Sequence, residues 1–361
     1  MVIVGAGLAG SLLALVLGRQ GRRVSIVDLE RTYPSDFRCE KLSPAQVALL
    51  ADLGALGCFD GVDLARQGLR YETMVAALRA AWPAQVRFIE GRVASLATSD
   101  NVQMATLANG ERLTARLLVL ATGPGEKLRA SLGIRRRMLR ERHSLCTGFT
   151  LVRRDGQAMT TVGMVRHGEV AGDRVGYASL FPMDGALRVN FFSYHHARDD
   201  WTRRLRAAPL AGLREVLPSL TPVIDGMTLA GPVEMRSTDL YVTEGHIQPG
   251  VVLIGDASAT CCPATGMGVT RILTDVGQLA NAYLADWLAS PGMATEKIAQ
   301  FYADPTRRRI DALARRKAET SRSAATETSL GWRAYRGLAW LKRGSTALAR
   351  STFAPRAERL A

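Results

Sequence analysis

The chain has 361 residues, of which 47% are hydrophobic, and a formal net charge of +14 at pH 7. This length is enough for two domains with buried cores, and the hydrophobic fraction is ordinary for a water-soluble protein. We expect a cytoplasmic protein without a metal site, because no signal peptide precedes the first strand, no apolar run approaches roughly 20 residues, and the five cysteines show no zinc-ligand spacing.

The first 28 residues have the pattern of a nucleotide-binding strand, turn, helix and strand. An apolar strand, Met1 to Val4, leads into a glycine-rich turn, and an apolar helical run from Leu12 to Leu17 follows. The turn contains three glycines: Gly5, Gly7 and Gly10. In such a unit the first glycine makes the turn, the second lets the backbone approach a pyrophosphate, and the third allows the helix to pack on the strand. Asp28 ends the second strand, Arg22 to Val27, where its carboxylate can bind a ribose and would repel a 2′-phosphate.

The next part of the chain predicts alternating helices and strands. Pro44 to Leu53 and Tyr71 to Ala81 have helical patterns, and Val86 to Glu90 is a strand. A meander with an Asn109-Gly110 turn follows. Its three strands are Val93 to Leu96, Val102 to Leu107 and Arg112 to Ala115. The strand that ends at Ala121 then returns to the first sheet.

From about Ser144 to Met235 the pattern becomes β-rich, which predicts a second sheet. Three strands are expected: Gly148 to Arg153, Gly176 to Phe181 and Leu187 to Tyr194. One helix, from about Thr202 to Val216, is expected after them. Six candidate pocket residues lie in or beside these strands: Phe181, Phe191, Phe192, Tyr194, His195 and His196. His195 or His196 could act as a base on a phenol, since histidine titrates near neutrality, although strand alternation lets only one of them face inward.

A second glycine-rich segment lies far from the first. Gly255 and Asp256 end an apolar strand, Val251 to Ile254, and a long helical pattern begins at Val269. Between them lie Pro263, Gly266 and Gly268. These pieces, together with the first 28 residues, resemble the FAD-dependent monooxygenases of the para-hydroxybenzoate hydroxylase type, in the group A flavoprotein monooxygenase superfamily.

The resemblance implies an α/β fold: an FAD-binding Rossmann-like domain of the glutathione-reductase type, an inserted β-sheet substrate domain and a C-terminal helical segment. We expect residues 1–143 and 236–290 to form the FAD-binding domain, 144–235 the β-rich substrate domain and 291–361 basic C-terminal helices. No second glycine fingerprint lies between Ala130 and Val251. NADH or NADPH would therefore bind only transiently over the flavin.

The resemblance also assigns cofactor contacts. Asp256 would bind the FAD ribityl chain, and the loop from Pro263 to Gly268, including Met267, would lie along the flavin ring. Arg38 matches best the basic residue that meets the FAD phosphates, and Lys41 is the second candidate. Where ring hydroxylases of this type carry Asp-Gly, this chain has Thr122 and Gly123. This difference leaves open how a nicotinamide donor is held.

The function implied is that of a monooxygenase. Flavin reduced by NAD(P)H would form a flavin hydroperoxide with O2 and transfer one oxygen atom to an organic substrate, aromatic or polyketide-like. Two alternatives stay open: an FAD-dependent reductase of an isoprenoid or lipid double bond, and a non-catalytic flavin-binding protein. A flavin halogenase is disfavoured because the WxWxIP segment of that group is absent.

The last sixth of the chain carries much of the surplus charge. From Tyr302 onward there are 14 Lys or Arg residues and 5 Asp or Glu residues. A first helical pattern includes Ile310 and Leu313, and a second continues through Leu330, Trp340 and Leu348. We expect no nucleic-acid partner. The open interpretations are a helical cap on the protein itself, a peripheral membrane contact, and contact with another partner such as an acidic carrier protein.

Overall fold

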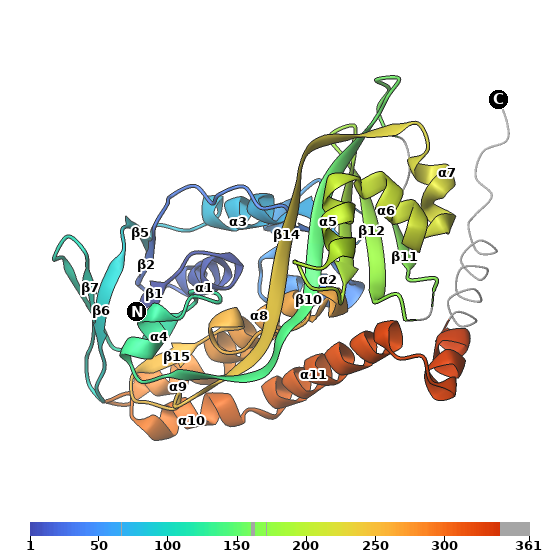
Figure 1. Cartoon of the computed structure of the whole chain (residues 1–361). Coiled ribbons are helices and arrows are strands. Elements are labelled where there is room, and N and C mark those ends of the chain that lie inside the picture. Colours follow the sequence, from blue (N-terminus) through green and yellow to red (C-terminus); the bar gives the residue numbers. More distant parts are fainter. Residues whose placement is uncertain (66, 160–162, 171, 340–361) are drawn as a thin grey trace, which may run out of the picture.

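A computed structural model describes residues 1–65, 67–159, 163–170 and 172–339. Two five-stranded sheets organise these residues. Figure 1 shows the parallel sheet with its helices on one side, the antiparallel sheet on the other, and helix α11 running beneath both. The arrangement agrees with the α/β fold and inserted sheet expected from the sequence.

The first sheet has the strand order β15-β9-β1-β2-β5, and all its neighbouring strands are parallel. Its strands are β1 (Val2–Val4), β2 (Val24–Asp28), β5 (Val86–Glu90), β9 (Leu118–Leu120) and β15 (Val251–Leu253). The predicted strands in these places are confirmed. Strands from both ends of the sequence meet here, because β9 pairs with β1 on one side and with β15 on the other.

Alternate residues of this sheet enter two different cores, as the period of a strand requires. Ile3 and Val252 pack on the helical side, and Val4 and Leu253 pack on the side of the meander. The helical layer comprises α1 (Leu8–Arg19), α2 (Pro44–Asp52), α3 (Tyr71–Ala80) and α8 (Met267–Gly277). The meander is β6 (Val93–Ala97), β7 (Gln103–Leu107) and β8 (Arg112–Ala115), close to its predicted bounds. Two short elements, β3 (Cys39–Glu40) and β4 (Leu69–Arg70), pair with each other, and α4 (Lys127–Ser131) follows β9.

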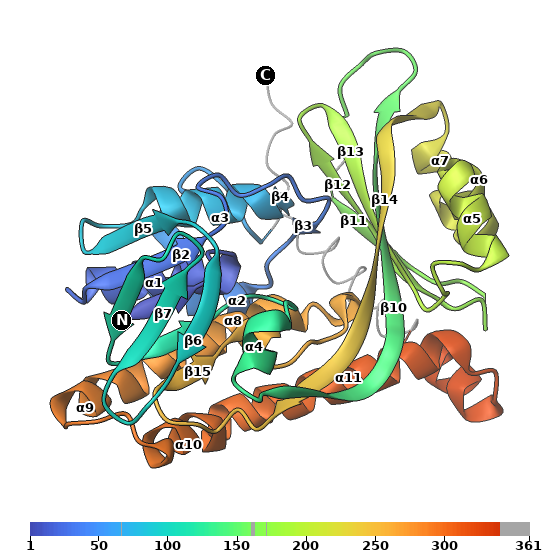
Figure 2. The same cartoon turned by 60° about the vertical axis from the view of Figure 1, so that its left-hand side comes forward.

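The second sheet is antiparallel, with the order β11-β12-β13-β10-β14. Its strands are β10 (Arg135–Arg153), β11 (Met164–His167), β12 (Val175–Met183), β13 (Ala186–Ser193) and β14 (Met227–Glu244). β10 is much longer than the strand expected at Gly148 to Arg153, and β14 was not predicted as a strand. The two strands pair from the first domain to the far end of the sheet, with three register shifts (Figure 2). The first eight residues of β10, 135–142, include five arginines and are mostly exposed, so they carry no apolar alternation that could predict a strand.

Three helices cover one face of this sheet: α5 (Asp200–Ala207), α6 (Pro209–Val216) and α7 (Thr221–Ile224). The single helix expected over Thr202 to Val216 is wrong. Proline lacks an N–H and restricts the residue before it, so the chain leaves helical geometry at Ala208 and restarts with Pro209 at the first helical position.

The C-terminal helices pack on both sheets. They are α9 (Leu284–Ala289), α10 (Thr295–Ala303) and α11 (Pro305–Thr326), after a π-helical stretch at Gln278–Tyr283. Ala314, Ala318 and Ala325 of α11 are buried. Residues 305–326 therefore form a cap on the protein itself. Trp340 and Leu348 of the predicted second helix lie outside the described residues. Within the described ranges, no helix is long and apolar enough to cross a membrane.

Candidate functional site

The turn between β1 and α1 has almost no room for side chains at two of its three glycines. Gly5 has a φ of +98°, and a Cβ there would lie 2.5 Å from the carbonyl oxygen of Ala121. A Cβ at Gly10 would lie 1.9 Å from the carbonyl oxygen of Gly5. At Gly7 the nearest atom would be a Tyr33 ring carbon, 4.0 Å away. Gly5 and Gly10 thus maintain the turn itself, whereas Gly7 leaves open space at the start of α1.

Asp28 holds this turn against the end of β2. Its carboxylate accepts hydrogen bonds from the backbone N–H of Ala6 at 2.5 Å and of Leu29 at 2.6 Å, and its side chain is 25% exposed. Arg79 of α3 donates to the carbonyl oxygen of Ala6 at 2.6 Å and lies 3.4 Å from Asp28. A carboxylate has about four acceptor positions, so Asp28 keeps capacity for a ribose hydroxyl. Arg79 could not be predicted from the sequence, because its role depends on a tertiary contact.

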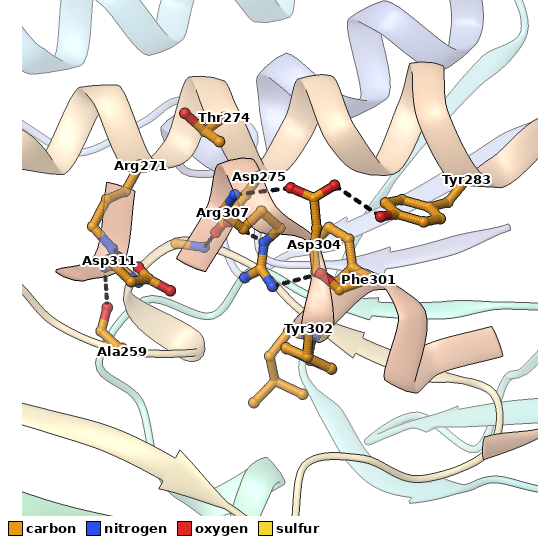
Figure 3. A network of polar contacts seen from close by, with 12 residues as sticks. Ala259, Arg271, Thr274, Asp275, Tyr283, Phe301, Tyr302, Asp304, Arg307 and Asp311 are labelled. Atoms are coloured by element: carbon orange, nitrogen blue, oxygen red, sulfur yellow. Dashed lines mark hydrogen bonds and ion pairs between the residues drawn. The ribbon is translucent and has the colours of Figure 1, made fainter. Parts of the chain in front are cut away.

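The Gly255-Asp256 turn is fixed by a buried ion pair behind it (Figure 3). The N–H of Gly255, which has a φ of +59°, donates to Asp275 at 2.9 Å. The other carboxylate oxygen of Asp275 accepts from Arg307 of α11 at 2.8 Å, and both side chains are at most 5% exposed. Arg271 and Asp311 form a second pair between α8 and α11 at 2.7 Å. The C-terminal helix is therefore part of the support for this turn.

The backbone around Asp256 is held, but its carboxyl is not. Tyr241 donates to the carbonyl oxygen of Asp256 at 2.6 Å, and the buried Arg129 donates to that of Ala257 at 2.6 Å. Within the described part of the chain, the Asp256 carboxyl has no hydrogen bond or ion pair, and burial raises its pKa. A buried polar group without a partner is costly and commonly marks a place where a ligand supplies the missing contacts.

The loop after this turn leads into α8. Pro263 begins a short 3-10 turn, and Gly266 takes the left-handed conformation with a φ of +63° at the N-cap of α8. Met267 is buried, and a Cβ at Gly268 would lie 3.6 Å from the Cys261 sulfur. Gly266 supplies no side-chain cap, and the N–H of Met267 donates to the Thr265 hydroxyl at 3.4 Å. The amides that follow Met267 and the partial positive charge of the helix start remain available for a ligand.

Thr122 and Gly123 lie after β9, beside the first glycine turn. A Cβ at Gly5 would be 3.1 Å from the Cα of Thr122, and Gly123 has a φ of +57° with open space around its missing Cβ. The buried Thr122 hydroxyl oxygen has no hydrogen-bond partner among the described residues. This hydroxyl and the Asp256 carboxyl are two oxygen-bearing groups near the glycine segments that have no hydrogen-bond partner among the described residues.

The two basic candidates for the phosphates differ in their surroundings. Arg38 makes a two-pronged contact with Asp36, at 2.6 and 2.9 Å, and stacks 3.7 Å above the Tyr71 ring centroid. Its side chain is 28% exposed, so it retains a face for a further acceptor. Lys41 is exposed and has no contact described. The geometry favours Arg38, although its role stays a prediction.

The three candidate catalytic residues, Tyr194, His195 and His196, have different surroundings. His195 stacks on Trp201 at 4.2 Å and contacts the carbonyl oxygen of Asp173 at 2.9 Å, and His196 is exposed. Tyr194 is buried, donates to Ser321 of α11 at 2.7 Å and lies 3.9 Å from the Cys262 sulfur. Only Tyr194 therefore approaches the loop that leads into α8.

The side of the second sheet opposite α5–α7 presents an aromatic surface to that loop. The strand register aligns Tyr177, Phe192, Cys146 and Arg236 in one row across β12, β13, β10 and β14. The rings of Tyr177 and Phe192 are 4.7 Å apart. We call the following group the aromatic cluster: Phe37, Cys146, Tyr177, Phe192 and Ala264. Of the pocket residues expected from the sequence, Phe192 belongs to it, whereas Phe191 points to the opposite face, into the core beneath the helices.

The features described above fit the parts of FAD. The open space at Gly7 and the uncapped start of α1 suit a pyrophosphate, and Asp28 suits a ribose. The unpaired Asp256 and Thr122 groups suit the polyhydroxylated linker. The start of α8 suits the ring edge that becomes anionic on reduction. These residue assignments remain predictions.

Comparison with known proteins supports the same cofactor. The FAD binding domain family matches residues 1–60. The chain is 26% identical over 335 residues to 3-demethoxyubiquinol 3-hydroxylase of Escherichia coli, covering 81% of this chain and 82% of that protein. It is 28% identical over 328 residues to menaquinone reductase of Mycobacterium tuberculosis, covering 79% and 76% respectively.

A solved structure shows the same fold over almost the whole chain. The p-nitrophenol 4-monooxygenase of Pseudomonas putida superposes with a TM-score of 0.70 at 18% sequence identity, covering 92% of this chain and 91% of that protein. The fold, the glycine-rich turn and the FAD binding domain match lead to one conclusion. The chain is an FAD-dependent oxidoreductase with the fold of FAD-dependent monooxygenases such as p-nitrophenol 4-monooxygenase, at low sequence identity to them.

Proposed function

We propose that the protein is a monooxygenase that inserts one oxygen atom from O2 into an organic substrate, aromatic or polyketide-like, with NADH or NADPH as reductant. The observation that carries this proposal is the aromatic cluster. In this cluster, side chains of the inserted sheet pack against Ala264, which lies in the loop assigned to the flavin ring. A flat organic ring bound against Tyr177 and Phe192 would lie next to the reacting part of the cofactor.

The residues of the chain bind and orient, whereas bound FAD supplies the redox and oxygen-transfer chemistry. Phe37, Tyr177 and Phe192 offer apolar ring faces that position a substrate and exclude water. Phe37 is fixed by close packing: a Cβ at Gly148 would lie 2.3 Å from its ring. The amides at the start of α8 would stabilise negative charge on a bound flavin.

A second candidate is an FAD-dependent reductase of an isoprenoid or lipid double bond. Thr122 and Gly123 stand where ring hydroxylases have Asp-Gly, and the similarity to menaquinone reductase covers most of the chain. Both curated relatives act, by their names, on quinone-type compounds. A neutral ring with a hydrophobic tail is therefore worth testing in either reaction.

The test uses purified protein reconstituted with FAD. Oxidation of NADH and of NADPH is followed with and without O2, across phenols, quinols and polyketide-like compounds. Substrate-stimulated oxidation that yields a product with one oxygen atom from O2 supports the monooxygenase. Loss of a carbon–carbon double bond without O2 supports the reductase. Bound FAD that no donor reduces supports a non-catalytic flavoprotein.

A further inference from the structure

Glu40 lies beside the aromatic cluster and belongs to none of the cofactor contacts above. It sits on β3, which is tied to the inner face of the inserted sheet. Asn190 donates from its side-chain amide to the carbonyl oxygen of Cys39 at 2.8 Å, and Arg188 donates to that of Phe37 at 2.6 Å. The backbone on the N-terminal side of Glu40 is therefore anchored to β13.

The direction of the Glu40 side chain follows from its neighbours. Residues that follow one another in a strand point to opposite sides, and the Cys39 sulfur points to Met183, 3.4 Å from its sulfur. Next to burial, the charge of Glu40 is the largest influence that raises the pKa of the Cys146 thiol, to about 12. Burial and the same charge raise the pKa of the Tyr177 hydroxyl. The Glu40 carboxyl thus lies on the side of the aromatic cluster.

This carboxyl has no partner because the nearby arginines are already engaged. Arg38 and Arg236 both pair with Asp36, at 2.6 and 3.4 Å. Burial opposes ionisation of Asp36, but Arg38 outweighs it and lowers the pKa of Asp36 to about 2. In the described part of the chain, Glu40 accepts no hydrogen bond and forms no ion pair; burial raises its pKa, and Arg38 only partly opposes this effect.

The charges around Glu40 also limit the substrate. The titratable and charged groups that act on it, or on which it acts, come from its own segment and from α3, β10 and β12: Asp36, Arg38, Cys39, Tyr71, Cys146 and Tyr177. Arg188 donates to a backbone carbonyl and lies 3.7 Å from Glu234. No arginine described beside the cluster is left without an acceptor, so the surroundings favour a neutral substrate over an anion.

We propose that Glu40 is the acid–base group of the substrate site and that it binds the hydroxyl group of a neutral phenolic or quinol-type ring lying on the aromatic cluster. This inference rests on the proposed function for its catalytic consequence. The Glu40 carboxylate accepts the hydroxyl proton: the substrate O–H bond breaks, a carboxyl O–H bond forms, and the electron pair stays on the ring oxygen. The ring becomes more electron-rich and more reactive toward an electrophilic oxygen atom. The proton returns when the product is formed.

The direct test is ligand binding without turnover. FAD-loaded wild type, Glu40→Gln and Glu215→Gln are titrated with 2-naphthol and with its methyl ether, which lacks the hydroxyl donor, and binding is read from the flavin absorption spectrum. Glu215 on α6 is 56% exposed and serves as the matched control. The wild type and the control should bind naphthol roughly 10- to 100-fold more tightly than the ether, the range for a hydrogen bond to a charged group. Glu40→Gln should reduce this preference about tenfold, because its amide is a neutral acceptor.

The pH dependence separates an acid–base group from a residue that only fills space. In the wild type the preference for naphthol should appear as pH rises, with a midpoint above the usual glutamate range, and it should be flat in Glu40→Gln. Equal or undetectable binding of both compounds to the wild type, or an unchanged preference in Glu40→Gln, overturns the proposal. Oxygen-dependent NAD(P)H oxidation is measured separately. If it is absent while the naphthol preference is present, the monooxygenase proposal fails and the role of Glu40 in binding stands.

Discussion

The cofactor end and the substrate end of the site are built in different ways. At the cofactor end the backbone decides: Gly5 and Gly10 are in contact with other main-chain atoms, and an added Cβ would overlap them. At the substrate end the shape of the site depends on side chains, which form one row aligned across four strands. The turn at Gly5 and Gly10 therefore tolerates almost no added atom, whereas the substrate end can change one side chain at a time on an unchanged backbone. The substrate of such a protein can therefore diverge while the cofactor stays the same.

The largest effect is expected at Gly10. In Gly10→Ala, the new Cβ would overlap the carbonyl oxygen of Gly5, and neither main-chain segment can move away easily. We expect loss of soluble folded protein or a destabilisation above about 3 kcal/mol. Gly7→Ala has open space and should fold normally but bind FAD roughly 10- to 100-fold more weakly, because its methyl group occupies the path of the pyrophosphate. Thermal unfolding and flavin content after reconstitution measure both. Equal behaviour of the two variants would contradict the distinction.

Arg307→Ala tests whether α11 supports the cofactor end from behind. The change leaves Asp275 buried without its partner, and breaking a buried pair in this way typically costs about 3–5 kcal/mol. Arg308→Ala removes the adjacent exposed arginine and should change stability by less than about 0.5 kcal/mol. The free energy of unfolding of the apo-protein in urea gives both values. A small effect in Arg307→Ala would mean that the Gly255 turn does not depend on the C-terminal helix.

Asp256→Asn should change binding and stability in opposite directions. The unpaired carboxyl costs the apo-protein stability, because burial raises its pKa above the ordinary value. The folded state then binds a proton more readily than the unfolded chain, so this cost appears as pH rises through the unfolded and then the folded pKa. At neutral pH the apo-variant should therefore be more stable than the wild type. Its FAD affinity should fall by roughly tenfold or more, since charge-assisted hydrogen bonds to the cofactor are lost.

The matched control for this change is Asp52→Asn, which alters an exposed aspartate at the end of α2. Its flavin content should not change. If Asp256→Asn purified with its full flavin content, the assignment of Asp256 as a cofactor contact would be wrong.

The sequence predicts the backbone turns at the cofactor end well because glycine is a specific signal for them. Gly5, Gly10 and Gly255 occur where the backbone needs a positive φ or a close approach, and the adjacent apolar runs mark the strands. The supporting residues Arg79, Arg129 and Arg307 could not be predicted, since an arginine shows no pattern that distinguishes a buried partner from a solvated charge.

The sequence predicts the substrate end poorly because the side chains that meet there depend on the pairing register of the strands. The aromatic cluster depends on how β10 pairs with β13 and β14, and three register shifts between β10 and β14 cannot be read from one chain. Neighbouring side chains of a strand point to opposite faces of the sheet. Phe191 therefore packs beneath the helices, whereas Phe192 belongs to the aromatic cluster. Glu40 lies between Arg38 and Lys41, and no pattern in this short segment distinguishes a shielded acid from a solvated one.

Phe191 and Phe192 therefore give a test of the two faces of one strand. Phe192→Leu should leave flavin content unchanged and lower kcat/KM for an aromatic substrate about 5- to 10-fold, through loss of a ring contact worth about 1 kcal/mol. Phe191→Leu should lower stability by about 1–2 kcal/mol and leave substrate preference unchanged, since its ring packs beneath the helices. Steady-state kinetics and urea unfolding on both variants decide. A similar kinetic defect in both would mean that the sheet does not separate substrate from core.

The smallest effect is expected for His195→Gln. Its imidazole stacks on Trp201 and contacts Asp173 and Asp199, on the side away from the flavin loop, so kcat should not change. Burial lowers the pKa of His195, which means that the unfolded chain binds a proton more readily than the folded protein. The contribution of His195 is then present above the unfolded pKa and is lost as pH falls toward the folded pKa. Unfolding measured at pH 7.5 and at pH 5.5 should show a slightly smaller acid destabilisation in the variant, with a total change of about 1 kcal/mol or less. A large fall in kcat would instead mean that this imidazole reaches the substrate. The substrate site would then extend beyond the aromatic cluster to the residues that precede α5.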